Sequence, residues 1–104
     1  MIEYSRTASG LTQAGGAVVI DVNGDAMAHQ MSTTKTGGTA GTLTVEVMPT
    51  GSGRFEVLTV NGVAVTLNLA DDKTFGPFDG SFDSVRVTPT GFDGTSYTVT
   101  LAGW

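Results

Sequence analysis

The sequence predicts an all-β fold, an antiparallel two-sheet β-sandwich of seven to nine short strands with Ig-like or jelly-roll connections. Two observations support this prediction. Apolar and polar residues alternate along most of the chain, whereas no segment has the period of an amphipathic helix. Short segments rich in Gly, Asn and Pro separate the alternating runs, as is typical of sandwiches and barrels. The chain has 104 residues, which is the usual length of one domain.

Residues 1–16 differ from the rest of the chain because they are small, polar and rich in Gly, as in "SRTASGLTQAGG". Two alternatives are open for this segment: an arm that pairs with a neighbouring chain, or an edge strand followed by a loop. Ile2 and Tyr4, two of its larger side chains, are candidate residues of a partner interface. Residues 17–104 are expected to form the sandwich.

Strand-like runs follow one another along the sandwich. "VVIDV" (18–22) and the weaker "AMAHQMST" (26–33) flank an Asn-Gly pair, which favours a hairpin with a type I′ turn. In "TLTVEVM" (42–48), apolar residues alternate with Thr and Glu, so one face of the strand is expected to be buried.

The second half of the chain follows the same pattern. "FEVLTV" (55–60) and "VAVTLNL" (63–69) flank a second Asn-Gly pair, which again predicts a hairpin. The segment 69–84 is the longest irregular stretch and is expected to cross between the sheets, with Pro77 ending a strand. "SVRVT" (84–88) and "SYTVTLA" (96–102) complete the predicted strands.

The phrase Val-x-Pro-Thr-Gly occurs twice, at 47–51 and 87–91. Each copy is expected to be a corner, with Pro at the second and Gly at the fourth position of a type I turn. Only the second copy continues into Phe92 and Asp93, whose side chains are expected to be exposed. These two residues are therefore candidates for a partner interface.

Composition narrows the possible partners. Ten acidic and five scattered basic side chains give a net charge of −5, so no nucleic-acid partner is expected. The longest apolar run (17–20) is too short to span a membrane, and the first residues lack the pattern of a signal peptide, so no membrane association is expected. Only 14% of residues are charged, against a typical value of about 25%. This favours a surface partly covered by neighbouring subunits, although small secreted β domains can have the same low charge content.

Residues that could carry chemistry are few. Cysteine is absent from the sequence, which excludes thiolate zinc sites and a cysteine nucleophile. His29 has no acid or nucleophile nearby in sequence, so a structural or interfacial imidazole is favoured, although a Ser-His-Asp site could assemble from distant residues. Loop aspartates could bind a hard cation, but Asp is also a common turn residue: Asp71, Asp72, Asp79, Asp83 and Asp93. We expect no enzyme, no metal and no cofactor.

Aromatic residues gather around the long irregular segment and the second corner: Phe75, Phe78, Phe82 and Phe92. Most are expected in the core, although aromatic side chains on loops also bind sugars by stacking. Trp104 is a further candidate for a partner interface, because a solvated Trp is unfavourable. It could dock onto a neighbour or fold back under the last strand.

"GTAGTLTVEV", "GRFEVLTVNGVAV" and "SVRVTPTGFDGTSYTVTLAGW" carry a resemblance. They resemble the small Thr- and Gly-rich β-sandwich proteins of tailed bacteriophage particles, above all capsid decoration (cement) and head-fibre proteins. The resemblance covers residues 37–104, whereas residues 1–36 match none of these proteins.

The resemblance implies a structural protein of the virion that is assembled in the host cytoplasm and that binds and stabilises the assembled shell. Its partners would be the major capsid protein or other virion subunits. It would form a homo-oligomer, with a trimer at three-fold positions as the favoured form. The alternative is a tail appendage, or a carbohydrate-binding or adhesion module that uses Phe78, Phe82 and Phe92 with the loop aspartates.

Overall fold

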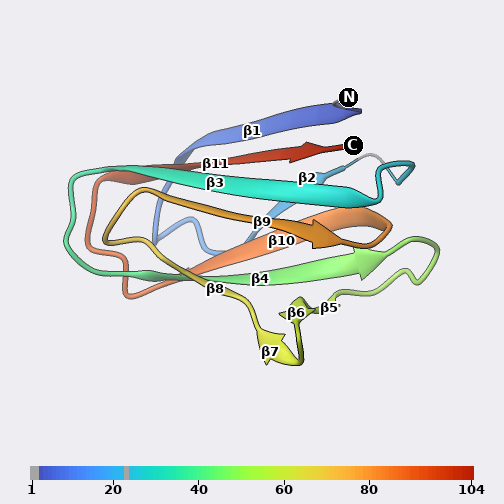
Figure 1. The fold of residues 1–104 in the computed structure, drawn as a ribbon. Coiled ribbons are helices and arrows are strands. Elements are labelled where there is room, and N and C mark those ends of the chain that lie inside the picture. The colour runs from blue at the N-terminus through green and yellow to red at the C-terminus, as the bar shows by residue number, and fades with distance from the viewer. Residues whose placement is uncertain (1–2, 23) are drawn as a thin grey trace.

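The computed structural model describes residues 3–22 and 24–104. Strands but no helix occur in these residues, and hence no helix that could span a membrane. Two antiparallel sheets pack face to face (Figure 1). Sheet A consists, in spatial order, of β1 (Tyr4–Leu11), β11 (Ser96–Gly103), β3 (Ala28–Thr36) and β9 (Lys73–Asp79). Sheet B consists of β2 (Val18–Asp21), β10 (Phe82–Thr90) and β4 (Thr42–Pro49), followed by β5 (Glu56–Val57) and β8 (Thr66–Asn68). The predicted all-β sandwich is confirmed.

The strand order is that of a jelly-roll. When β5 and β8 are counted as two parts of one edge strand, sheet A has the order β1-β11-β3-β9 and sheet B the order β2-β10-β4-β8. The chain crosses between the sheets at every connection except the one from β4 to this edge strand. Of the two connections that the sequence left open, the jelly-roll is therefore the one adopted. Its eight strands lie within the predicted number.

A small hairpin interrupts the edge strand formed by β5 and β8. β5 and β8 pair with successive parts of β4, and between them the chain leaves the sheet as β6 (Thr59–Val60) and β7 (Val63–Ala64). Asn61 and Gly62 have φ angles of 54° and 77°. These angles confirm the predicted type I′ turn. The hairpin extends away from the sandwich (Figure 1).

The hairpin predicted around Asn23-Gly24 is wrong. β2 pairs with β10 in sheet B, whereas β3 pairs with β11 and β9 in sheet A, so the two strands are not partners. Asn23 itself lies outside the described residues. An Asn-Gly pair allows the chain to reverse but does not specify which strand pairs next, and here β2 and β3 lie in different sheets.

The segment 69–84 is more regular than predicted, because it contains β9 and the beginning of β10. Pro77 lies within β9 and does not end it. His29 pairs with Phe78 and Met31 with Phe75, so β9 has one more residue than β3 over this interval. Such a bulge breaks the two-residue period that identifies a strand in sequence. Both Phe side chains are thereby placed toward the interior.

The two sheets contribute different side chains to the interior. Sheet B supplies Phe82 and otherwise mainly aliphatic residues: Ile20, Leu43, Val45, Val47, Leu67, Val85 and Val87. Sheet A supplies apolar residues and also side chains with polar atoms: Tyr4, His29, Thr33 and Tyr97. The polar chemistry of the interior is therefore concentrated in sheet A.

Candidate functional site

One end of the interior is organised around His29, which is fully buried on β3. Its Nε2 lies 2.7 Å from the carbonyl oxygen of Gly80, and its Nδ1 lies 2.7 Å from the hydroxyl of Tyr4. A carbonyl oxygen only accepts, so in the neutral ring Nε2 donates to Gly80 and the Tyr4 hydroxyl donates to Nδ1. Phe78 and Phe82 flank the ring, with centroids 5.4 and 5.0 Å away.

This arrangement shows that His29 is structural. Both ring nitrogens are bonded to groups other than a Ser hydroxyl or an Asp carboxylate, so no Ser-His-Asp site is assembled around it. The hydrogen bond also fixes Tyr4, one of the candidate interface residues, which is buried. Burial raises the pKa of Tyr4 to about 12, although the nearby Arg6 acts in the opposite direction. Ile2, the other candidate in this segment, lies outside the described residues.

The second Pro-Thr-Gly corner lies at the other end of the interior. Contrary to prediction, Phe92 is buried, and it packs edge-on against Tyr97 with ring centroids 5.5 Å apart. Its backbone N–H donates to the Gln13 side chain at 2.9 Å, while the Gln13 amide donates to the Pro89 carbonyl at 3.1 Å. Asp93 is exposed as predicted.

Asp93 nevertheless has a structural role. Its carboxylate accepts hydrogen bonds from the backbone N–H groups of Thr39 and Ala40, at 2.8 and 2.9 Å, and from the Thr39 hydroxyl. The two backbone donors lower the pKa of Asp93. Through Asp93, the loop after the second corner is therefore hydrogen-bonded to the loop that contains Thr39 and Ala40.

The first corner differs in its turn. The Ser52 N–H donates to the Pro49 carbonyl at 2.9 Å, and Gly51 has a φ angle of 80°. The turn thus begins at Pro49, one residue later than predicted. Gly51 is therefore its third residue and not its fourth. A positive φ at the third position requires Gly or Asn, which explains the glycine.

Three further aspartates accept hydrogen bonds, one in a loop (Asp72) and two on strands β2 and β10 (Asp21 and Asp83). Asp72 accepts the Lys35 N–H at 3.0 Å, Asp83 accepts the Gly51 N–H at 3.1 Å, and Asp21 accepts the Ser84 hydroxyl at 2.8 Å. Within residues 3–22 and 24–104, no three His, Asp or Glu side chains come together as possible metal ligands, and no pocket is present. The aspartates with these bonds stabilise turns and strand ends.

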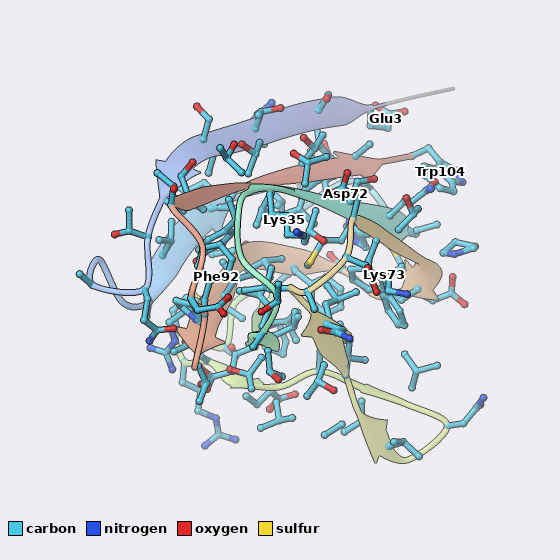
Figure 2. The ribbon with its side chains drawn as sticks, turned by 90° about the vertical axis from the view of Figure 1, so that its left-hand side faces the viewer. Glu3, Lys35, Asp72, Lys73, Phe92 and Trp104 are labelled. Carbon is cyan, nitrogen blue, oxygen red and sulfur yellow. The ribbon has the colours of Figure 1, made fainter. Side chains whose placement is uncertain are left out.

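Trp104 lies at the end of β11 opposite to Phe92 (Figure 2). It is 40% exposed, and its backbone is bonded to both Met27 and Ala28. Met27 is 59% exposed. Of the interface candidates, Tyr4 and Trp104 thus lie at one end of the sandwich and Phe92 and Asp93 at the other, so the structure does not bring all four together.

The outer face of sheet A is rich in hydroxyl groups. Thr7 on β1 pairs with Thr100 on β11, Thr100 with Ser32 on β3, and Ser32 with Thr74 on β9. This row crosses the entire sheet. The remaining outward positions of the two central strands also lack charge: Ser96, Thr98, Ala102, Gln30, Thr34 and Thr36.

The outer face of sheet B has a different chemistry. A row across it reads Val19, Arg86, Glu46 and Val57, from β2 through β10 and β4 to β5. Two hydrogen bonds of 3.0 Å join Arg86 to both carboxylate oxygens of Glu46 and raise the pKa of Arg86. The Phe55 ring lies 4.3 Å from the Arg86 guanidinium. Val19 and Val57 are 52% and 56% exposed.

This surface is the best candidate for a functional site. It combines exposed valines with an aromatic ring and an arginine whose charge is matched within the chain. Of these, the aromatic ring and the arginine belong to residue types that are enriched at protein interfaces. The sequence does not reveal this surface, because the alternation in "TLTVEV" and "SVRV" places Glu46 and Arg86 on an outer face but does not show which strands are neighbours.

Comparison with protein families, with curated proteins and with solved structures gave no match.

Proposed function

We propose that this protein is a structural component of a bacteriophage particle, a capsid decoration or head-fibre protein that binds the assembled shell. The outer face of sheet B is the contact surface. The observation that carries the proposal is the row from Val19 to Val57, in which exposed valines flank the matched pair of Arg86 and Glu46.

The chemistry of this row suits a protein partner. Burying an unmatched charge is costly, whereas Arg86 enters an interface with both its hydrogen bonds to Glu46 and its stacking on Phe55 already formed. The valines then contribute by losing contact with water. The jelly-roll supports the proposal more generally, since this fold is common in viral capsid and lectin domains.

Binding to the assembled shell explains how such a protein stabilises it. A subunit that binds only the assembled lattice shifts the assembly equilibrium by its binding free energy, repeated over many copies. The residues required for this role are those of the contact surface. A trimer at three-fold positions remains part of the proposal.

The alternative, a carbohydrate-binding or adhesion module, was expected to stack sugars on exposed aromatic rings. Phe78, Phe82 and Phe92 are all buried and pack against other rings or the interior. A sugar site would have to use other residues, and we do not propose one.

A sedimentation experiment tests the proposed function. The labelled chain is mixed with purified, undecorated heads of the phage or prophage that encodes it and, separately, with the free capsid protein. We expect saturable co-sedimentation with heads and none with free capsid protein. Absence of binding to heads, or equal binding to both, would overturn the proposal.

A further inference from the structure

β1 is a long strand at the edge of sheet A. It pairs on one side only, with β11. Most of its residues are exposed, and its contribution to the interior consists of the buried Tyr4 and the partly buried Ala8 and Leu11. Its attachment therefore depends on one strand ladder and a few side chains.

Tyr4 fits a specific socket at the end of β11, which we call the Tyr4 socket and which consists of Gly103 and His29. A Cβ atom at Gly103 would overlap the Tyr4 ring, so glycine is required there for the ring to lie flat on the strand. At the far end of the ring, the Tyr4 hydroxyl bonds to His29 Nδ1 at 2.7 Å. The socket thus recognises both the ring and the hydroxyl of a tyrosine.

The segment after β1 has the features of a hinge. Residues 12–17 contain two adjacent glycines, and Gly16 has a φ angle of 67°. Gln13 is anchored to the sandwich through Pro89 and Phe92. Both glycines follow Gln13, and their N–H groups donate to the carbonyls of Thr12 and Gln13 in a turn. Redirecting β1 therefore opens this turn and releases the hydrogen bonds of Gln13, while the rest of the sandwich stays in place.

We propose that two copies of this chain associate by exchanging β1. In the exchanged pair, Tyr4 of one copy occupies the Tyr4 socket of the other, and every contact between β1 and β11 is made again. The cost is then limited to the linker and to association, as in other exchanges of identical elements. The opposite edge of sheet A is less suited to adding a strand, because β9 contains Pro77 and an extra residue.

Concentration decides between the closed and exchanged forms. A short linker keeps β1 near its own sandwich at an effective concentration in the mM range. Exchange competes where copies are held close together, as on a repetitive surface or in concentrated solution. This inference does not depend on the proposed function, since it concerns the purified chain alone.

Cysteine cross-linking of the full chain tests the exchange. The sequence has no cysteine, and Ser5 and Ala102 are directly paired across β1 and β11. Opposite residues in such a pair lie within the span of a disulfide. A Ser5→Cys chain is mixed at high concentration with an Ala102→Cys chain of different mass, briefly destabilised with urea, and returned to native buffer under mild oxidation.

The matched control replaces Ala102→Cys by Thr74→Cys, which faces the same side of sheet A but lies on β9. We expect the mixed disulfide of Ser5→Cys with Ala102→Cys to exceed that control on the order of tenfold, because a paired strand holds the two thiols together. Adding Tyr4→Ala to the Ser5→Cys chain should abolish the excess.

A second measurement does not depend on cysteines. Deleting Gly15 and Gly16 shortens the linker, so β1 should reach a second copy more easily than its own sandwich. Light scattering should then show a dimer, with the strand content checked by circular dichroism. A mixed disulfide no more abundant than the control, or a folded, monomeric shortened chain, would overturn the proposal.

Discussion

Sheet A and sheet B share one architecture but distribute polar and apolar groups in opposite ways. Sheet A places polar atoms in the interior, at Tyr4, His29, Thr33 and Tyr97, and presents hydroxyl groups to solvent. Sheet B has a mainly aliphatic interior and carries apolar side chains around an ion pair on its outer face. Sheet B thus combines an aliphatic inner face with the proposed contact surface, whereas sheet A contributes buried hydrogen-bonding groups.

Those hydrogen bonds are themselves unequal. The Tyr4 hydroxyl is bonded to His29, but the Tyr97 and Thr33 hydroxyls have no partner among the described protein groups. Burying a hydroxyl without a partner is unfavourable, so the same chemical change is expected to have opposite consequences at the two tyrosines. The comparison between and within the sheets can therefore be tested by single substitutions.

The largest change in stability is expected from a substitution on the inner face of sheet B, whose side chains stabilise the fold by packing. Leu43 on β4 is fully buried. Leu43→Ala should lower the free energy of unfolding by about 2–5 kcal/mol, because it loses apolar burial and leaves a cavity. Urea unfolding followed by fluorescence or circular dichroism measures the change. A loss below that of the polar substitutions in sheet A would contradict the comparison.

The next largest change in stability is expected for Tyr4→Phe, with Tyr97→Phe as the substitution to compare it with. Tyr4→Phe leaves His29 Nδ1 buried without a partner and should cost about 1–3 kcal/mol of unfolding free energy. Tyr97→Phe removes a hydroxyl that has no partner, so stability should stay the same or rise. Equal destabilisation by the two changes would show that the Tyr4–His29 bond has no special role.

Alkaline pH should weaken the same end of the molecule. The pKa of Tyr4 is raised from 10.0 to about 12 in the folded chain, so the folded state favours the neutral phenol. The neutral Tyr4 phenol contributes on the order of 2 kcal/mol to the free energy of unfolding. This contribution is complete below pH 10 and is lost as the pH rises through about 12. Burial raises the pKa of Tyr97 as well, in the same direction.

Urea unfolding across this pH range measures the effect, with Tyr4→Phe as the control. The variant should show a smaller loss of stability between pH 10 and 12 than the parent chain. Identical slopes for both chains would mean that Tyr4 does not titrate abnormally.

The smallest effects should come from exchanging Val and Thr between the inner faces of the two sheets. Thr33→Val in sheet A removes a buried hydroxyl without a partner and should raise stability by about 1 kcal/mol. Val45→Thr in sheet B introduces such a hydroxyl and should lower it. Denaturation midpoints that move in the same direction for both variants would contradict the difference in polarity between the inner faces of the two sheets.

The sequence predicted the parts of the fold that depend on local patterns. Alternation identified the central strands, and Asn61-Gly62 identified the hairpin, because the backbone angles of a two-residue turn demand such residues. It failed where distant residues decide the outcome. The connection from β2 to β3 depends on which sheet accepts β3, and β9 was missed because its bulge breaks the alternation.

The candidate site was harder to predict for the same reason. Phe92 was expected to be exposed because it follows a turn. Its backbone N–H binds the side chain of Gln13, which is distant in sequence, and its ring packs against Tyr97 on β11, so its side chain is buried. Glu46 and Arg86 form the centre of the proposed contact surface only because β4 and β10 are neighbours in the jelly-roll. That adjacency depends on the strand order, which the sequence left open.

Adding one charge to each outer face tests most directly whether sheet B is the face that binds the shell. Val57→Lys changes the outer face of sheet B, and Thr98→Lys changes that of sheet A. In the sedimentation assay with undecorated heads, Val57→Lys should weaken binding about tenfold or more while Thr98→Lys leaves it unchanged. Unchanged binding by Val57→Lys, or an equal loss for both variants, would contradict this account.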